Sequence, residues 1–198
     1  MSRDAIRDTV IAHALESKKS LEVACLIRAH FEDVYKKAIS PFLQQLQNDL
    51  STSLGSGWTL QNSLIRDPKG ELCVFKAGWA DPADLSRTRC AVVLSQKGES
   101  GYYVGWRKYA PLAPQFSEAL EHELQLKLKG VGYTDVKYAN DWGLWWMVKR
   151  YSKWDQNAPQ VLWDMYDHCG DAVSYFKDAI RKWSDTIAPA VDEALLEG

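Results

Sequence analysis

The sequence predicts an α+β fold in which an antiparallel β-meander of about five to six strands packs against N-terminal and C-terminal helices. Two changes in hydrophobic period support this prediction. Apolar residues recur at helical spacing over 20–52, follow the shorter period of strands over 58–108, and return to helical spacing after residue 115. We expect residues 1–54 to form a helical segment and 55–198 an α+β domain, packed together as one compact unit.

The N-terminal helices are predicted from an apolar stripe that runs from Leu21 to Ala38 at helical spacing. Ser20 is a residue type that favours the N-cap position. Pro41 has no backbone N–H to donate and restricts the residue before it, so we expect a kink there between two helices. A separate short helix is expected before Ser20.

Turn-forming residues divide the central region into four short strands. The expected strands cover residues 58–65, 72–76, 90–94 and 102–108. The segments 67–70 and 98–101 are rich in the residue types of tight turns, and 81–84 has the composition of a loop. Strands joined by such short connections pair in antiparallel order.

The C-terminal part supplies a helix, a further strand and terminal helices. Helical spacing predicts a helix over about 115–129, ended by Gly130, and a strand or loop follows it. Residues 142–151 predict a strand that is apolar on both faces, which is typical of a strand covered on both sides. Beyond Asn157 we expect amphipathic helices separated by Gly170.

The charge balance excludes two classes of protein. The 198 residues include 24 Lys and Arg against 26 Asp and Glu, for a net charge of −2. This argues against a basic protein that coats nucleic acid and against an acidic mimic of nucleic acid, although a local basic patch stays open. We see no secretory signal and no run of roughly 18 apolar residues, so we expect a cytoplasmic protein that does not enter a membrane.

The cysteines predict neither disulfides nor a metal site. Cys25, Cys73, Cys90 and Cys169 form no C-x-x-C pair, and no histidine lies at zinc-finger spacing from a cysteine pair. Cys73 and Cys90 fall in strand-like runs and are expected to be free thiols of the core. His168 next to Cys169 would need further ligands from elsewhere. We expect no metal and no cofactor.

Aromatic residues are the most distinctive feature, with nine Trp and nine Tyr. Core packing explains most of them. In two segments, however, aromatic residues alternate with cations, as they do in protein–protein hot spots and on surfaces that stack nucleic-acid bases. The candidate partner-binding residues of these segments are Trp106, Arg107, Lys149, Arg150, Tyr151 and Trp154. Solvated cations at strand ends are the alternative explanation, and the wealth of Trp also fits a homodimer interface.

No catalytic motif is recognisable, so no catalytic residue is expected. One alternative is a nuclease that depends on a divalent metal, which needs an Asp on one strand and an acid-x-Lys triplet on the next. Asp135 and Lys137 supply such a triplet and would share one strand face. The element predicted before them is a helix, so the second acid has no counterpart.

The order of aromatic motifs suggests a family. Tyr-Tyr-Val-Gly-Trp at 102–106 is followed by a predicted helix, by Trp-Gly-Leu-Trp-Trp at 142–146, and by Trp154 and Trp163. This order resembles the C-terminal half of a bacterial and phage group assigned to the PD-(D/E)XK nuclease superfamily, over roughly residues 58–195. The catalytic half of that family has no counterpart here. The resemblance implies a non-catalytic accessory domain of the sort found in phage–host defence or counter-defence systems.

The sequence therefore favours a non-enzymatic, cytoplasmic binding or regulatory protein. It would contact a protein partner through the aromatic–basic face, in a phage–host defence or counter-defence system. A nucleic-acid-binding module that uses the same face is the first alternative. A cryptic metal-dependent nuclease centred on Asp135 and Lys137 is the second.

Overall fold

The chain divides into two compact units, residues 1–37 and 38–198. The computed structural model describes residues 3–67, 70–96, 101–109, 116–139, 143–152, 161 and 163–196. The division between the units falls inside helix α3 (Phe31–Ser53), earlier than the boundary that the sequence suggested after residue 54.

Two helices, α1 (Arg3–Leu15) and α2 (Lys18–Ala29), make up most of the first unit. The short helix expected at the N-terminus is present as α1. Ser17 caps α2, because its hydroxyl accepts a hydrogen bond from the backbone N–H of Ser20 at 3.0 Å. The N-cap is therefore Ser17 and not Ser20.

Helix α3 is continuous through Pro41, so the expected division into two helices at this residue is wrong. The interruption lies at His30, between α2 and α3. The residues that follow Pro41 are deeply buried, with Phe42 and Leu46 fully enclosed. Their burial offsets the hydrogen bond that a proline removes from a helix interior.

The second unit is built on a fully antiparallel sheet of six strands in the order β1-β2-β5-β6-β8-β7. Its strands are β1 (Trp58–Asn62), β2 (Glu71–Lys76), β5 (Cys90–Gln96), β6 (Gly101–Lys108), β7 (Lys137–Ala139) and β8 (Gly143–Ser152). The predicted α+β class, with an antiparallel sheet flanked in sequence by N- and C-terminal helices, is confirmed, and the sheet has six strands. The expected loop at 81–84 is the tight turn of a small hairpin formed by β3 (Ala80–Asp81) and β4 (Asp84–Thr88), and η1 (Ala77–Trp79) precedes this hairpin.

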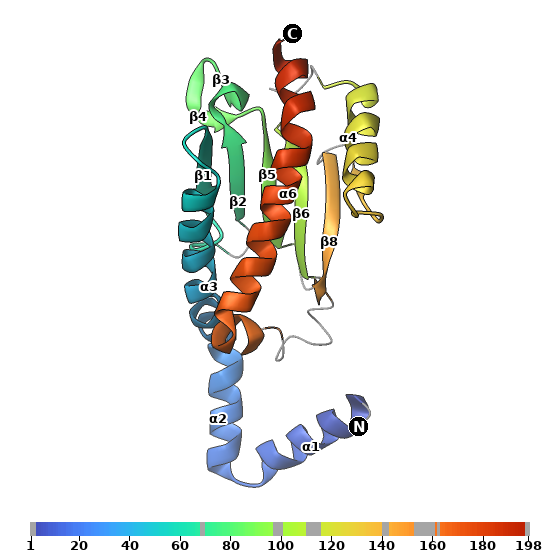
Figure 1. Cartoon of the computed structure of the whole chain (residues 1–198). Helices are drawn as coiled ribbons and strands as arrows, with labels where there is room; N and C mark the ends of the chain where they lie inside the picture. Colours follow the sequence, from blue (N-terminus) through green and yellow to red (C-terminus); the bar gives the residue numbers. More distant parts are fainter. Residues whose placement is uncertain are drawn as a thin grey trace. The chain divides into compact units, whose positions relative to one another are not determined.

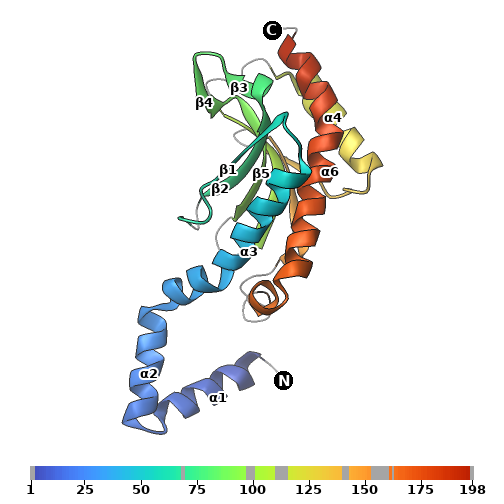
Figure 2. The same ribbon diagram turned by 60° about the vertical axis from the view of Figure 1, so that its left-hand side comes forward.

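Three helices cover one face of the sheet, as Figures 1 and 2 show. They are the second-unit part of α3, α4 (Glu118–Gly130) and α6 (Cys169–Leu196). Ser117 caps α4 by accepting a hydrogen bond from the backbone N–H of Leu120 at 3.2 Å. The expected break between the C-terminal helices is present but lies at His168 and not at Gly170, because residues 163–167 are helical and α6 begins at Cys169.

Aromatic packing between this face and the helices forms the centre of the core. The rings of Phe42 on α3, Tyr102 on β6 and Phe176 on α6 contact one another with centroids 5.3 to 6.4 Å apart. All three side chains are fully buried. Tyr151 of β8 extends the cluster, with its ring 5.0 Å from that of Phe176. Such rings bury large apolar areas, so they dominate the docking of α3 and α6 on the sheet.

Asp192 ties the C-terminal part of α6 to the sheet. One carboxylate oxygen accepts a hydrogen bond from the indole Nε1 of Trp79 at 2.7 Å, and the other pairs with Lys76 of β2. Trp79 is fully buried, so loss of the acceptor would leave its N–H unsatisfied at a cost of about 1–3 kcal/mol. The ion pair is partly exposed and contributes about 0–1 kcal/mol. The hydrogen bond to Trp79 is therefore the larger contribution.

We expect Asp192→Ala to lower the free energy of unfolding by about 2 kcal/mol. Asp192→Asn keeps an oxygen acceptor for Trp79 and should lose clearly less. Urea unfolding followed by tryptophan fluorescence measures both changes. The exposed neighbour Glu193 supplies the control, since Glu193→Ala should have little effect. Equal losses in the Ala and Asn variants of Asp192 would show that the ion pair, and not the hydrogen bond, is dominant.

Candidate functional site

The opposite face of the six-stranded sheet is not covered by α3, α4 or α6 (Figure 2). Side chains alternate between the two faces along each strand, and the register aligns them across strands. We call the surface so formed the helix-free face. It is formed by Glu71 and Cys73 of β2, the fully buried Ala91 and Val93 of β5, Tyr103 and Arg107 of β6, Lys137 of β7, and Trp145 and Met147 of β8.

An aromatic group occupies one part of this face. The rings of Tyr103 and Trp145 meet edge to face, with centroids 5.1 Å apart. The Nζ atom of Lys137 lies 5.3 Å from the centre of the Trp145 ring, within the range of a cation–π contact. Met147, opposite Tyr103 in the register, is partly exposed, as is Trp145. Aromatic residues and Met are enriched at the centres of protein interfaces.

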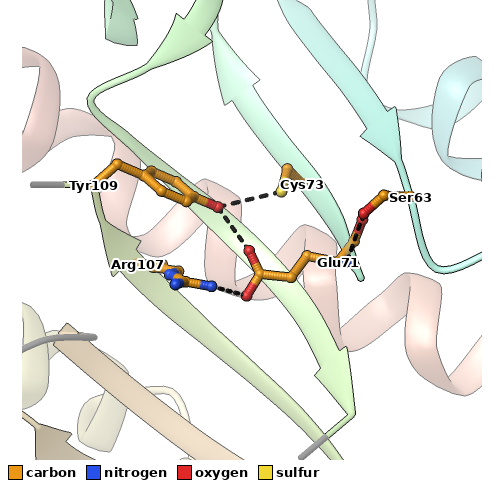
Figure 3. A network of polar contacts seen from close by, with 5 residues as sticks. All are labelled: Ser63, Glu71, Cys73, Arg107 and Tyr109. Atoms are coloured by element: carbon orange, nitrogen blue, oxygen red, sulfur yellow. Dashed lines mark hydrogen bonds and ion pairs between the residues drawn. The ribbon is translucent and has the colours of Figure 1, made fainter. Parts of the chain in front are cut away.

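A polar network occupies the neighbouring part of the face (Figure 3). The Glu71 carboxylate pairs with the guanidinium of Arg107 and accepts a hydrogen bond from the Tyr109 hydroxyl at 3.0 Å. The same hydroxyl lies 3.3 Å from the Cys73 sulfur. Glu71 and Arg107 therefore link β2 to β6 across the intervening strand β5.

Ser63 holds the beginning of β2 in place. Its hydroxyl donates to the Glu71 backbone carbonyl at 3.0 Å and accepts from the Glu71 N–H at 2.8 Å. Gly70 makes this close approach possible, because a Cβ atom there would lie 2.7 Å from the Ser63 carbonyl carbon. The turn thus sets the position from which the Glu71 side chain reaches Arg107 (Figure 3).

Protons in the network are held tightly. Burial raises the pKa of the Cys73 thiol to about 11, and the hydrogen bond with Tyr109 opposes this rise only in part. Burial, with the adjacent thiol and carboxylate, raises the pKa of Tyr109 well above its usual range. At neutral pH both groups stay protonated. A thiol attacks as the thiolate, and a general base works best with a pKa near the working pH. Neither group is prepared for nucleophilic or acid–base chemistry.

A polar hollow of about 340 Å³ adjoins the network. Glu71, Cys73 and Tyr109 line it together with the hydroxyl of Ser86 and the exposed side chain of Arg87 from β4. In the parts of the chain that the structure describes, no three His, Cys, Asp or Glu side chains gather closely enough to hold a metal ion. Its lining includes both hydrogen-bond donors and hydrogen-bond acceptors.

Two of the six residues predicted to bind a partner lie in the core instead. Trp106 is fully buried and packs against Phe116, with ring centroids 5.0 Å apart. Tyr151 is 1% exposed and contacts Phe176. Neither side chain can contribute to an exposed aromatic–basic face. The reason is strand alternation: Trp106 and Arg107 are neighbours in sequence and therefore point to opposite faces.

The remaining predicted residues do not form one group. Arg107 lies on the helix-free face. Lys149 is exposed and pairs with Asp135, and Arg150 is exposed beside the rings of Tyr151 and Tyr175. Trp154 lies outside the described residues.

Asp135 and Lys137 do not share a strand face as expected. Asp135 belongs to the turn before β7, and only Lys137 is part of the strand. A hydrogen bond and ion pair with Lys149 hold the pKa of the Asp135 carboxyl below its usual value. Lys137 approaches Trp145 instead. The two side chains thus have separate partners.

Comparisons of the chain with protein-family models, curated proteins and solved structures gave no match. The resemblance to the PD-(D/E)XK group stays a hypothesis. No helix within the described ranges is long and apolar enough to span a bilayer.

Sequence reasoning missed the aromatic group and Glu71. The two rings, Tyr103 and Trp145, are far apart in sequence and meet only through the register of β6 and β8. Trp145 and Met147 share the helix-free face with Tyr103, but position parity alone does not show this. A register shift between β6 and β8 leaves Tyr151, also at an odd position, in the core.

We expect iodoacetamide to alkylate Cys25 at neutral pH and to leave Cys73 unmodified. Cys25 is exposed, whereas burial keeps the Cys73 thiol protonated with a pKa of about 11. Alkylation of Cys73 should stay slow when the pH is raised to about 9, because that pH is still below the pKa of its thiol. Peptide mass spectrometry after timed exposure measures both, with a urea-unfolded sample as the control. Alkylation of Cys73 at the rate of a free thiol would contradict this expectation and would make it a candidate nucleophile.

Proposed function

We propose that this chain is a non-enzymatic binding protein whose helix-free face contacts a protein partner. The observation that carries the proposal is the partly exposed pair Trp145 and Met147, with the buried Tyr103 ring against Trp145 and Lys137 at the edge. Tyr and Trp are frequent binding hot spots, because they bury a large area and have few side-chain rotations to lose. The aromatic–basic chemistry expected from the sequence is thus retained with different residues.

The polar network supports binding over catalysis. Glu71 is ion-paired with Arg107, and the thiol and phenol beside it keep their protons at neutral pH. Groups held in this way are poor acids, bases and nucleophiles, but they make a rigid surface with defined donors and acceptors. A rigid surface loses little conformational entropy on binding, which favours affinity.

Charge pairing supports a protein partner over nucleic acid. Arg107 pairs with Glu71, and Lys149 pairs with Asp135, so a carboxylate already neutralises each of these cations. Binding to a phosphate backbone draws on cations that displace counterions. A nucleic-acid-binding module is the second candidate, because aromatic rings beside Lys137 could also stack bases.

The free cysteines and the resemblance to a known family bear on the cellular setting. Four free cysteines fit a reducing compartment such as the cytoplasm. If the resemblance to the PD-(D/E)XK accessory half holds, the partner belongs to a phage–host defence or counter-defence system. A nuclease centred on Asp135 and Lys137 has less support, because these side chains have separate partners.

A photo-crosslinking amino acid in place of Met147 tests the proposed face in cells that make the protein. We expect one discrete crosslinked protein that survives nuclease treatment. Adding Trp145→Ala should reduce its recovery at least about tenfold, as expected for a hot-spot tryptophan. Trp163 supplies the matched control: it is 55% exposed and lies outside the sheet, so Trp163→Ala should leave the crosslink unchanged. Thermal unfolding shows whether both variants are folded.

Two outcomes would count against the protein-binding proposal. A crosslink that persists in folded Trp145→Ala protein would show that the aromatic group is not the contact. Crosslinks to nucleic acid that weaken steeply with salt would favour the second candidate.

A further inference from the structure

The helices α1 and α2 of the first unit carry an apolar surface that their described residues leave exposed. Seven large side chains are between 45% and 66% exposed: Val10, Ile11, Leu15, Leu21, Val23, Leu26 and Ile27. A groove of about 590 Å³ runs between the two helices, with Val10, Ala14, Val23 and Ile27 among its lining residues. In α2 no residue is buried.

Two helices of this length have little stability of their own. The helices α1 and α2 have 13 and 12 residues, and isolated helices shorter than about 12–15 residues are marginal in water. Helices in proteins gain most of their stability from packing of an apolar face. The exposed apolar side chains of α1 and α2 therefore favour association with a further helical surface.

We propose that the α1–α2 pair is a self-association element that packs against the same pair of a second copy as a four-helix bundle. Complete coverage of the seven side chains in both copies, at roughly 90 Å² each, would bury at most about 1,200 Å², which is the lower limit for specific, stable interfaces. A two-fold arrangement uses the same surface twice, so each groove receives side chains of the other copy.

The charges of this unit favour a second copy over an anionic surface. Residues 1–37 contain seven Lys and Arg and six Asp and Glu. Helices that lie on anionic membranes or nucleic acid usually carry an excess of cations, which is missing here. Near-neutral, mixed charges let two identical surfaces approach without strong repulsion. The proposal is independent of the helix-free face, whose residues belong to the other unit.

Sedimentation of the full chain over a dilution series up to about 100 µM tests the proposal. The expected result is a concentration-dependent dimer. Val10→Glu combined with Ile27→Glu should weaken dimerisation at least about 100-fold, because two charges would be buried without partners. Ala12→Glu places the same charge on an exposed position of α1 that does not line the groove, so this control should still dimerise.

A spin label on Cys25 gives a second measurement. Cys25 is the exposed one of the four cysteines, and Cys169→Ser removes the next most accessible site. A dimer through α2 should give a dipolar coupling between two labels, and the double Glu variant should lose it. The milder pair Val10→Ala and Ile27→Ala repeats the test if circular dichroism shows that the Glu variant has lost helix.

Three results would overturn the proposal. The first is a monomer over the whole dilution series. The second is a dimer that survives a helical form of either double variant. The third is a monomer that binds vesicles of anionic phospholipid, which would assign the apolar surface to a membrane.

Discussion

Burial of one sheet face under α3, α4 and α6 is the constraint on which the second unit depends. Tyr102 and Trp106 of β6 enter this interface and contact Phe176 and Phe116. Because side chains alternate along a strand, a residue that points into the core is followed by one that points to the opposite face of the sheet. The aromatic group and the polar network on the helix-free face are therefore determined by which residues the helices bury.

The fold class could be predicted from the sequence, because changes of hydrophobic period are visible without tertiary information. The positions at which helices begin and end could not be predicted in the same way. Pro41 is unfavourable in an isolated helix, but burial of side chains such as Phe42 outweighs this local cost. The short β3 strand has too few residues to give a periodic signal.

The candidate site was less predictable than the fold. The β8 strand is apolar on both faces, so its sequence does not indicate which side chains point to the core. Its register with β6 supplies that information and places Trp145 beside Tyr103, while Leu144 and Val148 are buried.

The division into two units has a further implication under the two proposals. A dimer formed through α1 and α2 would carry two helix-free faces, one from each chain, and linked sites gain avidity when a partner can engage both.

The shortness of β7 bears on how this protein would aggregate. β7 has three residues, yet it pairs with β8 along Gly143–Trp145 at the edge of the sheet. A short edge strand with a lysine is a poor template for another chain, whereas β8 would present the apolar run from Leu144 to Val148. Runs of this kind, rich in β-forming residues and free of charge, form intermolecular cross-β structure when exposed. Detachment of β7 would thus expose β8 as an unprotected edge strand. Assembly of β8 strands from several chains into fibrils would then compete with re-pairing of β7 and β8.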